Sequence, residues 1–248
     1  MVMGVVEGLV DSVQHSGLEG TRILITGLKS RHGVEIARAF AEQGCRLVLQ
    51  TPEMNSDLAI VLEVLASDAQ DVRVSETPIS DDASALKLAQ WASGAFGGLD
   101  VVINLACLDD AGLEPDACIE DIEDRLSATL SGPFRITQVI ANRMQLTWKE
   151  GLILNIVTQR DAETPAAVQL GQIARAALSA LTRQEAARWA GKAVRVNAIV
   201  PSAELGCIPG EFETGLASEN EIAELALRLA SGHGKGISGL TFDAALVG

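Results

Sequence analysis

The chain contains no tyrosine among its 248 residues, and aromatic residues make up only 3% of it. No tyrosine hydroxyl can therefore act as a general acid anywhere in this protein. Only three histidines are present, and the four cysteines lie far apart, without a CxxC pair or a histidine at ligand spacing. This pattern favours neither a zinc site nor a disulfide framework, and it fits a protein of the reducing cytoplasm.

Basic residues are also scarce: 19 Lys and Arg stand against 33 Asp and Glu, which gives a net charge of −14. Such a charge repels nucleic-acid phosphates and anionic lipid heads, so we expect neither nucleic acid nor membrane as a partner. No run of 18 apolar residues is present, so no transmembrane span is expected. Residues 1–17 lack the basic start of a signal peptide, and their apolar spacing predicts a short amphipathic helix, either a docking extension or a cloning remnant.

Over residues 18–248, apolar β-type runs alternate with helical patterns. Each run is continuously hydrophobic, which is typical of a parallel sheet buried on both faces. Gly44, Gly97 and Gly191 stand where the intervening helices should end. The pattern predicts one α/β domain with a Rossmann-like, doubly wound parallel sheet in three αβα layers. The predicted strands are 22–26, 46–50, 72–76, 100–105, 152–157 and 194–200.

The first strand, RILIT, ends at Thr26 and continues as GLKSRHG into a helix. Gly27 permits a tight backbone turn, and Gly33 permits close approach of the helix N-terminus, whose amides and dipole favour an anion. TGLKSRHG resembles the TGxxxGxG loop of the short-chain dehydrogenase/reductase family. That family has a Rossmann fold and uses NAD(H) or NADP(H).

Five further segments resemble motifs of this family, in the same order along the chain. They are LDVVINLAC (99–107), GLILNIVT (151–158), ARAALSALTR (174–183), VRVNAIVPS (194–202) and GISGLTFDAAL (236–246). The resemblance implies NAD or NADP as cofactor. The cofactor-binding positions that it implies are Thr26, Gly27, Ser30, Arg31, Gly33, Asn104, Ala106 and Arg175.

Several cofactor positions depart from the family pattern. Arg31 replaces the middle glycine of the turn; it either binds phosphate groups together with Lys29 or props the loop closed. Thr51 stands where NAD-preferring members hold the ribose with an acid, and Pro78 replaces the aspartate beside the adenine. The resemblance therefore leaves nucleotide binding weak or absent.

The catalytic positions implied by the resemblance are altered as well. Gly171 stands at the proton-transferring tyrosine and Arg175 at its partner lysine, while Thr158 matches the serine and Thr129 the asparagine. Glycine has no proton to give and arginine stays protonated at working pH, so the family's standard chemistry is excluded. We expect Gly171 to lie beside the old cleft without a role in core packing. We expect Arg175 to face that cleft, available to an anion or to a carboxylate such as Asp161.

Other residues offer no clear replacement acid. Asp161 and Glu163 are interpreted as solvated loop carboxylates, Cys107 as a small buried hydrophobe, and His32 as a residue packed under the first helix. Residues 207–220 are much shorter than the family's usual lid, which predicts poor exclusion of water from a reacting centre.

Three hypotheses follow. The first is a catalytically degenerate family member with a structural, regulatory or oligomer-partner role, forming a homodimer, a homotetramer or a mixed oligomer with an active relative. The resemblance implies association through helices at 118–147 and 165–190 and the last strand. The second is an NAD(P)-dependent oxidoreductase of a small carbonyl or alcohol, in which Arg175 holds the cofactor and Thr158 or water relays the proton. The third is a protein that binds a different anion through Arg31 and Arg175.

Overall fold

Seven strands form one sheet in this computed structural model, which describes residues 17–114, 116–146, 150–159, 164–201 and 218–244. The strand order is β3-β2-β1-β4-β5-β6-β7, and every neighbouring pair is parallel. The order reverses between β1 and β4, and in open α/β sheets the crevice that binds ligands lies beyond the carboxyl ends of the strands at such a point. The strands are β1 (Arg22–Thr26), β2 (Arg46–Gln50), β3 (Asp71–Ser75), β4 (Val101–Leu108), β5 (Gly151–Gln159), β6 (Val194–Pro201) and β7 (Thr241–Ala244).

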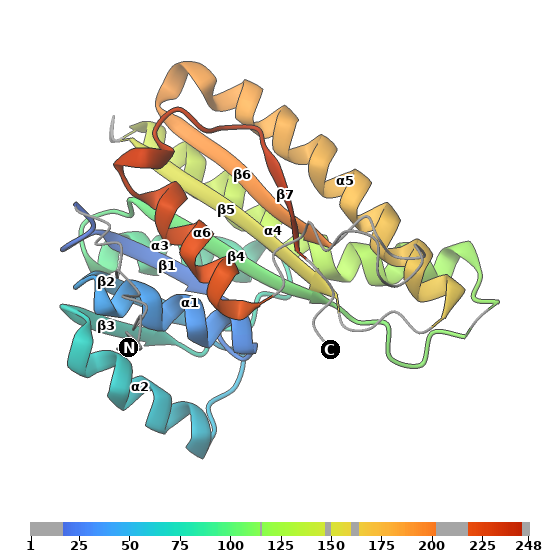
Figure 1. Cartoon of the computed structure of the whole chain (residues 1–248), viewed down its shortest axis with the longest axis horizontal. Helices are drawn as coiled ribbons and strands as arrows, with labels where there is room; N and C mark the ends of the chain where they lie inside the picture. Colours follow the sequence, from blue (N-terminus) through green and yellow to red (C-terminus); the bar gives the residue numbers. More distant parts are fainter. Residues whose placement is uncertain (1–16, 115, 147–149, 160–163, 202–217, 245–248) are drawn as a thin grey trace, which may run out of the picture.

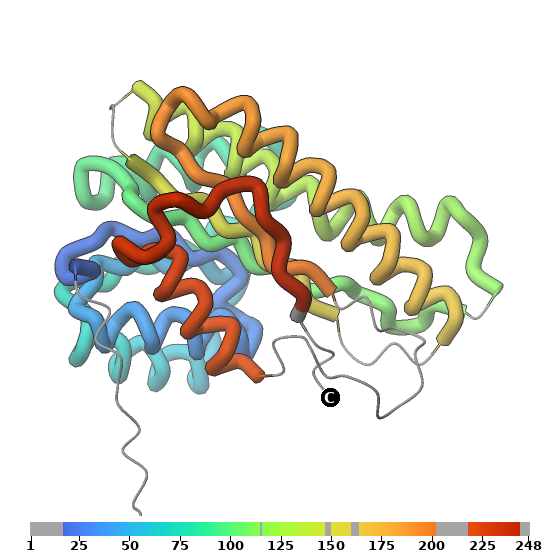
Figure 2. The backbone as a smooth tube through the Cα atoms, turned by 45° about the horizontal axis from the view of Figure 1, so that its top comes forward, coloured from blue at the N-terminus to red at the C-terminus, as the bar shows by residue number. Residues whose placement is uncertain are grey.

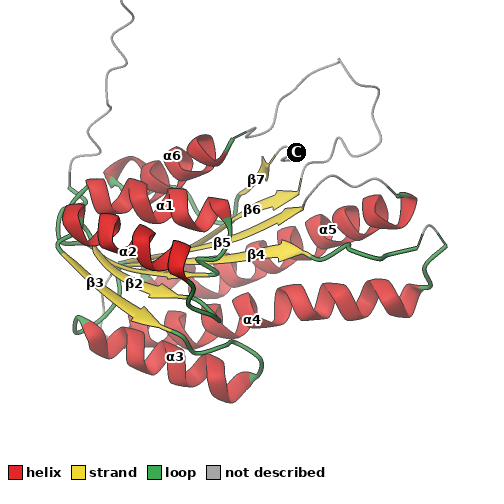
Figure 3. Cartoon of the chain, turned by 90° about the horizontal axis from the view of Figure 1, so that it is seen from below, coloured by secondary structure: helices red, strands yellow, loops and turns green. Residues whose placement is uncertain are grey.

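Helices cover both faces of the sheet, as Figures 1 and 3 show. One face packs against α1 (Arg31–Glu42), α2 (Ser56–Asp68) and α6 (Glu219–Ala230). The other packs against α3 (Asp82–Ala95), α4 (Ile119–Leu146) and α5 (Pro165–Trp189). The predicted Rossmann-like sheet in three layers is therefore confirmed.

The predicted strands agree closely with those observed. The first two have the predicted bounds, and the other four shift by up to three residues at an end. The central strand β5 is buried along its whole length, because helices cover both of its faces. The edge strand β3 is only partly buried, since it has a neighbour on one side alone.

The three predicted helix ends are confirmed, two of them with the glycine in the left-handed conformation. Gly44 and Gly97 follow α1 and α3 with φ of 67° and 69°, which glycine adopts without strain. At Gly191 the predicted helix end is confirmed, since α5 ends at Trp189, but Gly191 is not the left-handed residue: a 3-10 turn follows at Ala190–Lys192, and Ala193 takes the left-handed conformation at φ 56°. The 3-10 turn therefore places the left-handed residue at Ala193, two positions after Gly191.

Some expectations concern parts of the chain outside the described residues. These are the amphipathic helix in residues 1–17, nearly all of the 207–220 segment, and the carboxylates Asp161 and Glu163. Within the part of the chain that is described, no helix is long and apolar enough to cross a membrane.

Candidate functional site

The turn between β1 and α1 is built around two glycines. Gly27 has φ 73°, and a Cβ there would lie 2.5 Å from the carbonyl oxygen of Leu105 on β4. A Cβ on Gly33 would lie 2.9 Å from the carbonyl oxygen of Gly27. Side chains at these positions would collide with backbone atoms, which cannot move aside cheaply. The packing of the turn therefore requires both glycines, whether or not a cofactor binds.

Polar groups of the same turn also stabilise the fold. The Ser30 hydroxyl accepts the Gly33 N–H at 3.0 Å and donates to the Gly27 carbonyl at 3.3 Å, so it caps α1. Arg31 is exposed and, with Lys29, lines a cavity of about 330 Å³ beside the N-terminus of α6. Its side chain thus lies at the surface, where its charge is accessible to an anion; a phosphate contact stays a prediction.

The end of β2 does not present ribose-binding groups. Thr51 is fully buried, and its hydroxyl donates to the Glu53 carbonyl at 2.7 Å. The Gln50 side chain accepts the Gly27 N–H at 3.1 Å and donates to the Thr77 carbonyl at 2.9 Å. These polar groups bond to the protein's own backbone, so in the observed conformation they are not offered to an adenosine ribose in the family's way.

A buried polar network crosses the middle of the sheet. The Asn104 amide donates to the Asn155 side chain at 2.8 Å and to the Thr137 hydroxyl at 3.3 Å. The Thr26 hydroxyl lies 3.5 Å from the Asn104 side-chain oxygen. All four residues are buried, and they connect β1, β4, β5 and α4. Two predicted cofactor positions, Thr26 and Asn104, therefore stabilise the core; the third on these strands, Ala106, is half-buried.

Arg175 binds the ends of two strands. Its guanidinium forms an ion pair with Asp243 on β7 and donates to the carbonyl of Pro201, at the end of β6, at 3.3 Å. The predicted carboxylate partner, Asp161, lies outside the described residues; the partner found is 68 positions away along the chain. At the position of the family's lysine, the cation is thus neutralised by a contact that holds α5 against β6 and β7.

The other catalytic positions lie around the carboxyl end of β5. Gly171 is buried in α5, one turn before Arg175, so it does not lie outside the packing as expected; its place beside the old cleft stays a prediction. Thr158 is 5% exposed and pairs in register with Cys107 on β4, so the two side chains share one face of the sheet. Cys107 is exposed, which contradicts its expected burial: β4 extends to Leu108, and Cys107 lies near its open carboxyl end.

Thr129, at the position of the family's relay asparagine, is buried in α4. Its hydroxyl donates to the carbonyl of Arg125 at 2.9 Å, one turn earlier in the same helix. Because that proton is engaged within the helix, the observed conformation does not offer Thr129 as a donor to a proton relay.

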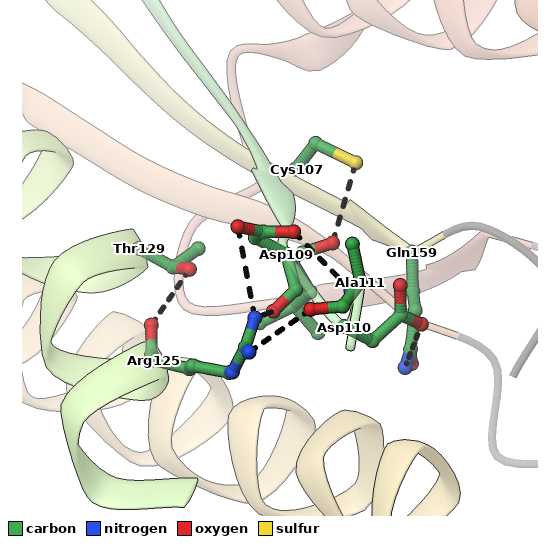
Figure 4. A network of polar contacts seen from close by, with 8 residues as sticks. Cys107, Asp109, Asp110, Ala111, Arg125, Thr129 and Gln159 are labelled. Atoms are coloured by element: carbon green, nitrogen blue, oxygen red, sulfur yellow. Dashed lines mark hydrogen bonds and ion pairs between the residues drawn. The ribbon is translucent and has the colours of Figure 1, made fainter. Parts of the chain in front are cut away.

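Figure 4 shows a network that sequence reasoning missed. The Arg125 guanidinium donates to the carbonyls of Asp109 and Ala111 at 2.7 and 3.0 Å. The Gln159 amide donates to the Asp110 carboxylate at 3.3 Å and to the Ala167 carbonyl at 2.8 Å. The segment after β4 is thereby tied to α4 and α5 beside the crevice. The sequence feature that could have indicated this network is the pair Asp109 and Asp110, which directly follows the buried strand β4.

A seven-stranded parallel sheet with a glycine turn after its first strand is the Rossmann-like architecture that is typical of dinucleotide-binding α/β proteins. A sequence model of the family described as short chain dehydrogenase matches residues 21–214, and the chain belongs to this family. D-threitol dehydrogenase of Mycolicibacterium smegmatis is 29% identical over 194 residues, which cover 76% of this chain and 72% of that protein. Galactitol 2-dehydrogenase (L-tagatose-forming) of Cereibacter sphaeroides is 29% identical over 234 residues, covering 86% and 89%.

Solved structures show the same fold. Hydroxysteroid dehydrogenase from Escherichia coli superposes with a TM-score of 0.72 at 25% identity, covering 93% of this chain and 97% of the other. A short chain dehydrogenase from Burkholderia cenocepacia J2315, solved in complex with NADP, gives a TM-score of 0.75 at 19% identity, covering 93% and 98%.

Proposed function

We propose that this chain is a catalytically degenerate short-chain dehydrogenase with a structural, regulatory or oligomer-partner role. The observation that carries the proposal is the contact of Arg175 with Asp243 and the Pro201 carbonyl. The resemblance assigns this position to a lysine that holds the nicotinamide ribose and lowers the tyrosine pKa. Here the cation is engaged by the fold, and the tyrosine position is a buried glycine, Gly171.

The proposed cofactor behaviour is weak or absent binding of NAD or NADP. The glycine turn, with Lys29 and Arg31 at the surface, suits a pyrophosphate. The ribose positions do not suit the rest of a dinucleotide, because Thr51 and Arg175 are bonded within the protein. We therefore assign no catalytic step to a bound cofactor.

The proposed assembly is a homodimer or homotetramer, or a mixed oligomer with an active relative. Support comes from the outer face of α5, where the small residues Ala176, Ala180 and Ala187 and the apolar Ile173 are exposed at helical spacing. Small side chains allow a second helix to approach closely.

A second candidate is an NAD(P)-dependent oxidoreductase with a non-standard proton relay. It is favoured by the position of the Thr158 hydroxyl beside the exposed Cys107 thiol at the crevice. The names of the relatives as threitol and galactitol dehydrogenases suggest a polyol as its substrate. This candidate requires saturable cofactor binding.

Titration with NADH and NADPH separates the two candidates. The emission comes from three tryptophans without a tyrosine background, so quenching and energy transfer are easily read. We expect no saturation below about 1 mM cofactor, a free energy of binding weaker than about −4 kcal/mol, and no oxidation of D-threitol or galactitol above the blank. Saturable micromolar binding with turnover would support the second candidate.

The double variant Gly171→Tyr, Arg175→Lys completes the experiment by restoring the two missing side chains. We expect it to remain inactive, because the ribose-binding groups near Thr51 are still absent. Measurable ketone reduction by this variant would show that only the acid and its partner had been lost.

A further inference from the structure

A cavity of about 600 Å³ lies at the amino ends of β5 and β6, at the opposite edge of the sheet from the crevice. In Figures 1 and 2 this region is the upper left of the molecule, where the end of α5 and the segment between α6 and β7 come together. Small residues form most of its walls. They are Ala186, Ala187, Ala190 and Ala193 on one side and Gly236, Ser238 and Gly239 on the other.

The shape of this amino-edge cavity is fixed by backbone contacts. Gly239 has φ 82°, and a Cβ there would lie 3.3 Å from the Cβ of Ala186. The Val196 N–H donates to the Ser238 hydroxyl at 3.2 Å, and the Gly239 N–H donates to the Val196 carbonyl at 2.8 Å. The wall after α6 is therefore held directly against β6.

Three cations from three different elements reach the amino-edge cavity. Arg183 comes from α5, Arg195 from β6 and Lys235 from the segment after α6, whereas Glu150 is the single acid that lines it. Three positive charges and one negative charge give the lining a net charge of +2 in a chain of net charge −14. The cavity is thus electropositive against an acidic background, which attracts anions.

The acid does not neutralise the arginines. Glu150 lies 3.8 Å from the Lys235 ammonium, and both side chains are largely exposed. Arg195 donates to the carbonyls of Leu229 and Gly234 at 3.0 and 2.8 Å. Burial lowers the pKa of Arg195 from its ordinary value, and the charge of Glu150 opposes this only in part, so a second anion nearby would offset the remaining desolvation cost. Neither Arg183 nor Arg195 makes an ion pair among the described residues.

We propose that the amino-edge cavity binds a small doubly charged anion, of the phosphate monoester or dicarboxylate class. Arg183 and Lys235 contact the charged groups, and the alanine wall of α5 accommodates the uncharged body of the ligand. The volume lies within the range of small-molecule sites, about 300 to 1,000 Å³. The site shares no residue with the predicted cofactor positions, although its wall includes Ala187, which also belongs to the α5 face proposed for assembly.

Calorimetric titration of the full chain with inorganic phosphate, succinate and acetate at constant ionic strength tests this site. We expect a single saturable site at which both dianions bind about tenfold tighter than acetate, because they interact with two cations rather than one. Arg183→Gln and Lys235→Gln should each weaken binding of the dianions about fivefold or more. Ala190→Leu should also weaken binding of the dianions by narrowing the cavity, without any change of charge and without touching the α5 face proposed for assembly.

Two charge-matched controls locate the site. Lys192→Gln removes a cation that lies over the Trp189 ring, outside the cavity lining, and should change binding less than twofold. Arg31→Gln removes a cation at the first turn and should also leave binding unchanged. The proposal is overturned if Lys192→Gln weakens binding of the dianions as much as the cavity variants do, or if Arg31→Gln alone weakens it. It is also overturned if no binding is seen at 10 mM anion, about ten times a weak millimolar Kd. A different result would also contradict the proposal: the chain binds no phosphate, and Arg183→Gln or Lys235→Gln dissociates an oligomer in sedimentation. The cavity would then be an interface between copies of the chain.

Discussion

The turn after β1 and the helix α5 both carry family motifs, yet they differ in what they retain. In the turn, Gly27 and Gly33 match the family, and a Cβ added to either residue would lie within 3 Å of a backbone atom. In α5, the positions that the resemblance assigns to the tyrosine and lysine are Gly171 and Arg175, and the arginine is bound to another strand. Under the proposed function, features that the fold itself needs persist, whereas side chains needed only for chemistry are absent. The glycines of the turn are therefore weak evidence for cofactor binding.

The largest expected effect comes from Gly27→Ala. The new Cβ would lie 2.5 Å from the Leu105 carbonyl oxygen, and the alanine would have to adopt the backbone φ of 73°. We therefore expect a loss of about 3 kcal/mol or more in the free energy of unfolding. Gly97→Ala is the matched control: its φ is 69°, but nothing lies within 4 Å, so only about 1 kcal/mol should be lost. Urea unfolding measures both, and equal losses would mean that close packing does not explain why the turn is retained.

A smaller effect is expected from Asn104→Ala, which removes the amide that donates to Asn155 and Thr137. Loss of buried hydrogen bonds should lower the free energy of unfolding by about 2 kcal/mol. The control Thr26→Val removes only a long contact of 3.5 Å and should lose about 0.5 kcal/mol. If Asn104→Ala leaves unfolding unchanged, a role in the core cannot account for this residue.

Ser30→Ala should have an effect of about 1 kcal/mol, as is usual for loss of an N-cap. The variant leaves the Gly33 N–H without its hydroxyl acceptor at 3.0 Å. Chemical unfolding measures the change, and Ser30→Thr, which keeps a hydroxyl, should restore most of it. Full stability of Ser30→Ala would leave the hydroxyl free for a role toward a phosphate.

The smallest expected effect is a pH dependence due to His32, which is buried in α1 with its Nε2 unpartnered among the described residues. Burial lowers the pKa of His32, partly opposed by Glu219 of α6. The unfolded chain therefore takes up a proton first, and stability falls as the pH drops below about 6.5 toward the lowered folded pKa. Stability of His32→Gln should be flatter over this window, while the exposed His233→Gln should behave like wild type.

The fold could be predicted from sequence because continuous apolar runs report burial on both faces. Strands β1 and β2 have the predicted bounds, and His32 is buried as expected, although it lies in the first turn of α1 rather than beneath the helix. Hydropathy failed for Cys107, since it cannot show that the end of a buried strand lies at an open edge. It also missed the left-handed turn at Ala193, where alanine occupies a conformation that glycine usually takes.

For the candidate site, the sequence predicted which residues share an element but not their tertiary contacts. Motif spacing placed Gly171 and Arg175 in one helix, as observed. The partner of Arg175 lies on β7, and only the packing of β6 and β7 against α5 brings the two charges together. The contacts of Arg125 with the segment after β4 likewise depend on tertiary structure, because they join residues 14 and 16 positions apart across a helix end.

The coupling free energy between Arg175 and Asp243 tests the central claim most directly. It is measured by a double-mutant cycle of Arg175→Met and Asp243→Asn in urea unfolding, with the exposed Lys29–Glu53 pair as reference. The predicted coupling is about 1 to 2 kcal/mol for the half-buried pair, against about 0.3 kcal/mol for the exposed pair. A coupling near zero, together with NADH binding that is lost in Arg175→Met, would mean that Arg175 serves a cofactor rather than the fold.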